Sequence, residues 1–250
     1  MSLEFFVTWM MVFLRTVGLI VQLPVVAGRP IPMLVRGGIC MCIASLLTGV
    51  VPPAEVPATL WALAISAAGE VLVGLVLGFV VRMAFAAVEM AGRIISTEVG
   101  LSAAPGMGVP EPASEPLAAM LSTFAVVLFF LFGGHLMMLS ALSRSFTLMA
   151  AGNPSLMADS GDSMIRASAH VIELGFRIAA PFIAMNFLVT LSFSTLGRVV
   201  PKLNPFIISF SLKLMVGFTL LASAGALLAR HLYDESGQTP LRMLEVLSGT

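Results

Sequence analysis

The chain has 250 residues, of which 58% are hydrophobic and 10% are charged, and its formal net charge at neutral pH is zero. Charged residues make up about a quarter of an ordinary soluble domain, and nucleic-acid binding normally requires a basic surface. The composition therefore argues against a soluble domain and against nucleic acid as a partner. It indicates an all-α membrane protein whose helices contact a lipid bilayer.

Six apolar runs predict long helices, because each approaches the ~20 residues that a bilayer-spanning helix needs. No stretch between them is long enough for a separate soluble domain, which usually requires at least about 50 residues. We therefore expect one integral membrane domain over residues 1–250. The predicted helices cover residues 4–28, 33–51, 58–98, 117–142, 166–196 and 206–229.

A charge lies near the centre of two apolar runs: Arg15 in the run over residues 4–28, and Glu70 in the run over residues 58–81, which begins the third predicted helix. An isolated charge at the bilayer centre costs about 2.5–3.5 kcal/mol on insertion scales, so such side chains normally face protein or water. We expect the two residues to offset each other's burial, within the chain or across a subunit boundary. The alternative is a small-molecule secondary transporter with a midplane site at Arg15, Glu70 and His135.

Other polar and small residues predict helix packing. Gly74 and Gly78 form a GxxxG pattern, which lets two helices approach closely. A mild polar face on the fifth predicted helix, made of Asn186, Thr190 and Ser194, indicates interhelical hydrogen bonding. His135 could titrate near neutral pH, but we expect it to be a hydrogen-bonded packing residue.

Two predicted helices carry a stripe of polar side chains along one face. Within the stripes, Glu89 precedes Arg93 and Glu173 precedes Arg177 by four residues, the favourable order for an ion pair on a helix. The stripes are either solvated faces of helices that emerge from the bilayer, or surfaces that line an aqueous path or meet partner subunits. At 100° per residue they comprise Arg82, Glu89, Arg93 and Ser96, and Arg166, His170, Glu173 and Arg177.

The helical periodicity is lost between residues 100 and 116, where glycine and proline are frequent. A solvated linker would carry more charge, and irregular backbone at membrane depth is tolerated only inside protein or around water. The segment is either a surface loop or a plug that folds back into the molecule. The candidate plug residues are Gly100, Leu101, Pro105, Gly106, Met107, Gly108, Val109 and Pro110.

Sequence motifs for catalysis do not occur: there is no phosphate-binding loop, zinc motif, nucleophile elbow or Cys/His cluster. Cys40 and Cys42 lie two residues apart on a predicted helix and point to different faces, which indicates small packing residues. We therefore expect no enzyme activity, no cofactor and no metal.

Short motifs follow one another in order through essentially the whole chain. They are Phe13-Leu14-Arg15, Pro24-Val25, Ile31-Pro32, Val35-Arg36, Gly69-Glu70, Ala91-Gly92-Arg93-Ile94-Ile95, Gly133-Gly134-His135-Leu136, Ser145-Phe146, Pro201-Lys202-Leu203-Asn204-Pro205-Phe206 and Lys213. This set resembles the FliR/SctT family of export-gate subunits, found in flagellar and virulence type III secretion. Pro205 and Leu212 depart from the family pattern, which leaves the subfamily open, while the Gly-Gly-His motif favours the flagellar branch.

The resemblance implies a gate subunit in the bacterial inner membrane, at the flagellar basal body, that secretes unfolded substrates. It implies kinked helices arranged as hairpins, with a FliP-like N-terminal part and a FliQ-like C-terminal hairpin. One copy of the chain would assemble with FliP-like, FliQ-like and FlhB-like membrane subunits, and residues 100–116 would plug the closed pore. The residues expected at helix or subunit contacts are Arg15, Glu70, Glu89, Arg93, Glu173, Arg177 and Lys213.

Overall fold

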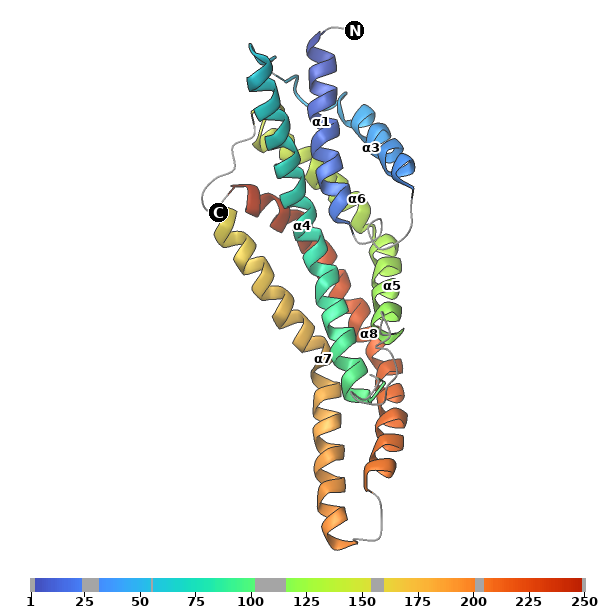
Figure 1. Ribbon diagram of the computed structural model, residues 1–250. Helices are drawn as coiled ribbons and strands as arrows, with labels where there is room; N and C mark the ends of the chain where they lie inside the picture. The colour runs from blue at the N-terminus through green and yellow to red at the C-terminus, as the bar shows by residue number, and fades with distance from the viewer. Residues whose placement is uncertain are drawn as a thin grey trace. The chain divides into compact units, whose positions relative to one another are not determined.

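The structure, a computed structural model, describes residues 3–23, 32–54, 56–101, 116–153, 160–200 and 205–248. These residues form helices joined by turns, with no strand among them, which confirms the all-α fold. The long apolar helices confirm a membrane protein. Along the chain the helices are α1 (Leu3–Gln22), α3 (Met33–Leu47), α4 (Leu60–Val99), α5 (Pro116–Leu131), α6 (Gly134–Leu148), α7 (Ser160–Val199) and α8 (Pro205–Ser248) (Figure 1).

Helix α3 is shorter than the sequence predicts, because it ends at Leu47 rather than at residue 51. Thr48 follows it, and its hydroxyl donates to the carbonyl of Ala44 over 2.6 Å. At a rise of 1.5 Å per residue, its 15 residues cover about 22 Å, less than the ~30 Å of a bilayer's hydrocarbon core. α3 therefore does not reach across a bilayer.

The predicted helix over residues 117–142 is two helices, α5 and α6, bent by 67° at the break between them. Gly133 lies at the break with φ of 72°, a left-handed conformation that glycine adopts readily and other residues rarely do. The apolar run continues through this position, so hydrophobicity alone could not reveal the break.

Helix α8 continues to Ser248, well past its predicted end at residue 229. Its last part is polar in composition but places Leu232, Thr239 and Met243 on a buried face at helical spacing. Arg242 Nη1 also forms an ion pair with Glu235 Oε2 over 2.7 Å, across the turn that contains Pro240. A search for apolar runs ends too early on such an amphipathic helix.

Three of the described helices are long and apolar enough to cross a membrane, or five if each bent pair counts as one span, where the sequence predicts six. Helices α4 and α7 have 40 residues each and α8 has 44. Their lengths of about 60–66 Å are twice the thickness of the hydrocarbon core. Each helix is therefore longer than a single crossing of the hydrocarbon layer requires.

The chain divides into two compact units that interleave along the sequence. Unit 1 comprises Met1–Ala84, Phe129–Ala169 and Asp234–Thr250, and unit 2 comprises Phe85–Leu128 and His170–Tyr233. Four of the helices pass from one unit to the other, so the units are not consecutive domains.

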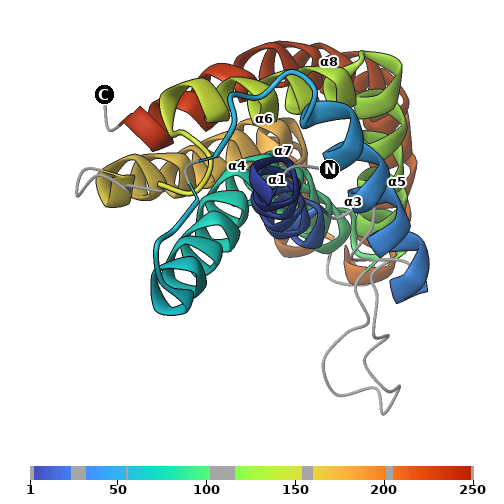
Figure 2. The ribbon, with the colours of Figure 1, turned by 90° about the horizontal axis from the view of Figure 1, so that it is seen from above.

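In unit 1, α1 lies between α3 and the first part of α4 (Figures 1 and 2). The α1–α4 contact depends on glycine: a Cβ atom on Gly74 would overlap the carbonyl of Arg15, and one on Gly78 would lie 2.7 Å from the carbonyl oxygen of Leu19. Gly18 on α1 is equally close to the backbone of α4. Small residues on both helices therefore let the two backbones touch.

In unit 2, the last part of α4 packs against α5 and α7. A Cβ atom on Gly92 would lie 2.8 Å from the Cα atom of Ala118 on α5. Gly175 on α7 makes a similar approach, with its Cβ position 3.3 Å from the carbonyl oxygen of Ala87. Close helix packing through small residues is thus common to both units.

Candidate functional site

Arg15 on α1 and Glu70 on α4 form a fully buried ion pair in unit 1. Arg15 Nε donates to Glu70 Oε2 over 2.6 Å, and both side chains are 0% exposed. Arg15 lies four residues from both Met11 and Leu19, which are also completely buried, so helical spacing directs all three to the interior. The two charges that interrupt the apolar runs are therefore brought together within the chain.

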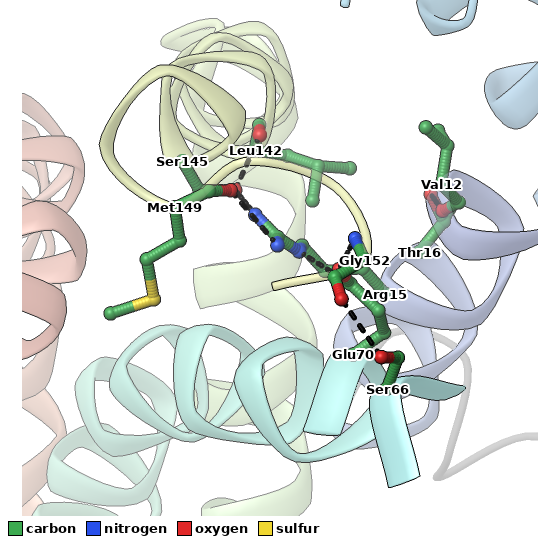
Figure 3. A network of polar contacts seen from close by, with 9 residues as sticks. All are labelled: Val12, Arg15, Thr16, Ser66, Glu70, Leu142, Ser145, Met149 and Gly152. Carbon is green, nitrogen blue, oxygen red and sulfur yellow. Dashed lines mark hydrogen bonds and ion pairs between the residues drawn. The ribbon is translucent and has the colours of Figure 1, made fainter. Parts of the chain in front are cut away.

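The rest of the guanidinium group binds the C-terminal end of α6 (Figure 3). Nη1 donates to the Ser145 hydroxyl over 2.9 Å, and Nη2 donates to the carbonyl of Met149 over 3.2 Å. The guanidinium carbon lies 3.9 Å from the ring centroid of Phe146, a cation–π contact. A positive charge at this position also complements the negative end of the α6 dipole.

The second carboxylate oxygen of Glu70 binds the turn that follows α6 (Figure 3). The backbone N–H of Gly152 donates to Glu70 Oε1 over 2.9 Å, and the hydroxyl of Ser66 donates to the carbonyl of Gly152 over 2.8 Å. Gly152 has φ of 88°, which favours glycine at this position. We call the set of Arg15, Ser66, Glu70, Ser145, Phe146, Met149 and Gly152 the charged node.

The geometry of the charged node indicates a structural role rather than a catalytic one. Both charges are hydrogen-bonded and closed to solvent, and the set contains no activated nucleophile or general base. Removing one partner of a buried pair typically costs about 3–5 kcal/mol, because the other charge is left uncompensated. The node therefore fixes the end of α6 against α1 and α4.

His135 does not belong to the charged node. It lies at the first turn of α6, ten residues before Ser145, which corresponds to about 15 Å along the helix. Its ring centroid lies 5.2 Å from that of Phe130, and its Nδ1 atom is buried without a hydrogen-bond partner in the described part of the chain. The predicted hydrogen bond of a packing histidine is thus not seen at Nδ1.

The two polar stripes contain ion pairs that are exposed. Glu89 and Arg93 on α4 pair over 2.7 Å with side chains 51% and 65% exposed, and Glu173 and Arg177 on α7 pair over 2.7 Å with both side chains over 60% exposed. Exposed pairs of this kind stabilise a helix by only about 0.3–0.5 kcal/mol. Their charges remain available to a partner or to water.

The α4 stripe is shorter than predicted, because Ser96 is 1% exposed and faces the interior. Arg82 is exposed as predicted, and it donates to Gln22 Oε1 over 3.1 Å. At 100° per residue, Ser96 is the member of the stripe that lies nearest to the buried face of α4, which includes Gly92 and Ile95. On α7, Arg166 is exposed and His170 is half-buried.

Of the candidate plug residues, only Gly100 and Leu101 belong to the described part of the chain. Gly100 has φ of 87° at the end of α4, and Leu101 is 41% exposed. Lys213 is half-buried on α8. The others, Pro105, Gly106, Met107, Gly108, Val109 and Pro110, lie outside the described residues.

Sequence reasoning missed the partners of the charged node on and after α6. Ser145 and Phe146 carried one signal, because they form one of the motifs that mark the family resemblance. Met149 and Gly152 carried no signal for these contacts, since they bind through a backbone carbonyl and a backbone N–H that almost every residue possesses.

Comparisons with known proteins cover nearly the whole chain. Residues 6–238 match the family described as bacterial export proteins, family 1. The chain is 32% identical to the flagellar biosynthetic protein FliR of Escherichia coli over 226 residues, which are 89% of this chain and 87% of that protein. It is 28% identical to FliR of Bacillus subtilis over 226 residues, with 88% and 86% covered. It is 27% identical to the Yop proteins translocation protein T of Yersinia pestis over 224 residues, with 86% and 84% covered.

Proposed function

Since this chain belongs to family 1 of the bacterial export proteins, we propose that it is a membrane subunit of a flagellar protein export gate, without catalysis of its own. The family assignment confirms the resemblance predicted from the sequence. The identity of 32% to a flagellar FliR, against 27% to the Yop translocation protein, favours the flagellar branch.

One observation carries the proposal that the chain works within an assembly: α7 exposes large apolar side chains over a length greater than the thickness of the hydrocarbon core. Ile172 is 54% exposed, Val199 is 78% exposed, and Phe187 between them is 64% exposed. From Ile172 to Val199 the helix advances 27 residues, which corresponds to about 40 Å, against ~30 Å for the hydrocarbon core. Partner subunits would cover the surface that lies beyond the hydrocarbon.

We propose FliP-like and FliQ-like membrane subunits as these partners, with an FlhB-like subunit nearby and one copy of this chain in the assembly. The complex would lie in the bacterial inner membrane at the flagellar basal body and pass unfolded substrates. Within it, residues 100–116 would plug the closed pore. The charged node would keep the end of α6 fixed while other parts of the assembly move.

A transporter site at Arg15, Glu70 and His135 gains no support from the geometry. Arg15 and Glu70 are 0% exposed and bound to each other, and His135 lies about 15 Å along α6 from the residue that contacts Arg15. A substrate would find no free polar group at the node.

The test is co-expression of the tagged chain with the FliP-like and FliQ-like proteins, followed by native mass spectrometry of the purified material. We expect a discrete complex that contains one copy of this chain. Deletion of residues 102–115 should then leave the complex assembled and make vesicles that contain it leak ions. A stable lone monomer or homodimer that binds neither partner would contradict the proposal.

A further inference from the structure

The C-terminal end of α4 has a defined geometry. Gly100 adopts φ of 87°, its N–H donates to the carbonyl of Thr97 over 3.1 Å, and the N–H of Leu101 donates to the carbonyl of Ser96 over 2.8 Å. These two bonds form a Schellman motif, in which a left-handed glycine ends a helix and satisfies its last carbonyl groups. The direction in which the chain leaves α4 is therefore fixed locally.

Three consecutive residues at this end of α4 each contact α7 or α8, within unit 2. Glu98 Oε2 accepts a hydrogen bond from Asn186 Nδ2 on α7, which is the predicted interhelical bond. Val99, 2% exposed, packs against Gly217 on α8, where a Cβ atom would lie 2.7 Å from Val99 Cγ2. A Cβ atom on Gly100 would lie 3.1 Å from the ring of Phe210 on α8. We call these six residues the α4 clasp.

Each contact of the α4 clasp demands a particular residue type. Position 217 requires glycine because a Cβ atom there would clash with the side chain of Val99. Position 100 requires glycine because its φ is positive. Glu98 and Asn186 form a polar contact between two largely apolar helices. The Thr190 hydroxyl donates to Asn186 Oδ1 over 3.3 Å, which orients the amide. Polar pairs in apolar interfaces are best known for setting register.

We propose that the α4 clasp couples the position of α7 and α8 to the point at which the chain leaves α4. The inference rests on the proposed gate function, in which α7 meets partner subunits and α8 packs beside the end of α4. A shift of either helix would move Val99 and Gly100, and with them the start of the segment that follows. Glu98, Gly100, Asn186 and Gly217 are therefore positioning residues.

The test compares Gly217→Ala with Gly225→Ala in the full chain, assembled with its co-expressed membrane subunits. Both positions lie on α8, but a Cβ atom at Gly225 meets nothing within 4 Å. Gly217→Ala should raise ion leakage through reconstituted vesicles by about fivefold or more, since the usual cost of overpacking shifts a packing equilibrium by about that factor at its lower end. Gly225→Ala should leave leakage unchanged. The double variant Gly217→Ala with Val99→Ala, which removes the two clashing methyl groups, should restore low leakage.

A second readout does not depend on gating. Spin labels at Leu101→Cys and Met215→Cys, both exposed residues, report the distance between the end of α4 and α8 once Cys40 and Cys42 are replaced by serine. We expect a narrow distance distribution that Gly217→Ala broadens and Val99→Ala narrows again. If Gly217→Ala does not assemble, Asn186→Leu, which loses the hydrogen bond without the Gly217 clash, takes its place.

The two readouts separate the outcomes. A distribution that Gly217→Ala or Asn186→Leu leaves narrow would overturn the α4 clasp. In a second outcome, the distance distribution broadens but neither the substitution nor the deletion of residues 102–115 causes leakage. This result would support the α4 clasp as a contact, but it would contradict both its coupling role and the proposed gate function. A broadened distribution without leakage, where the deletion does leak, would overturn the coupling alone.

Discussion

The charged node and the stripe ion pairs have nearly the same geometry and opposite surroundings. Arg15 and Glu70 pair over 2.6 Å, and Glu89 and Arg93 pair over 2.7 Å. The first pair is 0% exposed and joins residues 55 positions apart, while the second is more than half exposed and joins neighbouring turns of one helix. Distance alone therefore says little about an ion pair's contribution; burial and the number of further hydrogen bonds decide it.

The largest effect should come from Glu70→Ala, which leaves the Arg15 guanidinium buried without a carboxylate and the Gly152 N–H without an acceptor. We expect unfolding of the purified protein in detergent to lose about 3–5 kcal/mol of stability. Trp9, stacked on Phe13 in α1, offers a fluorescence signal for this unit. Glu173→Ala is the matched control, and an equal loss in both variants would contradict the comparison.

Exchange of the two charges, Arg15→Glu with Glu70→Arg, should recover only part of that loss. A carboxylate at position 15 would face the Met149 carbonyl, and a guanidinium at position 70 would face the Gly152 N–H, so both backbone contacts become unfavourable. The neutral pair Arg15→Met with Glu70→Leu should unfold at higher denaturant concentration than either single neutral variant. Complete recovery by the exchanged pair would show that the backbone contacts contribute nothing.

A smaller effect is expected for Ser145→Ala, which removes one hydrogen bond to the guanidinium but leaves the ion pair intact. Hydrogen bonds to charged groups contribute about 1.5–3 kcal/mol, and the same unfolding assay should detect a loss of that size. Ser140→Ala, at an exposed position of the same helix, should stay within about 0.5 kcal/mol of the unsubstituted chain. Equal behaviour of the two serine variants would place Ser145 outside the node.

The smallest effect on the isolated chain is expected for Glu89→Gln. Loss of the exposed pair with Arg93 should change stability by no more than about 0.5 kcal/mol, and salt should reduce the difference further. The same substitution in the co-expressed complex distinguishes the two interpretations of the stripe. A reduced yield of complex would indicate a contact with a partner subunit, and an unchanged yield would indicate a solvated face.

The sequence by itself determined the all-α membrane class, the family and the need to bury Arg15 and Glu70 against protein. These conclusions depend on composition and on charges that are expensive in an apolar run, which are visible without coordinates. The sequence also placed Gly74 and Gly78 on one face, and the structure shows that this face lies against α1. The apolar runs located most of the helices but not the ends of α1, α3 and α8; α1 ends at Gln22, where the sequence predicts residue 28.

Only the tertiary structure decided what the two charges bind besides each other and where the apolar run over α5 and α6 bends. Arg15 contacts Ser145 and Met149 more than 125 positions away, and Glu70 contacts Gly152 across 82 positions. Two of these contacts use backbone groups, which are the same in almost every residue and leave no trace in the sequence. They form because folding brings the end of α6 to the buried charges. A buried charge is stable only when hydrogen bonds replace its lost contacts with water.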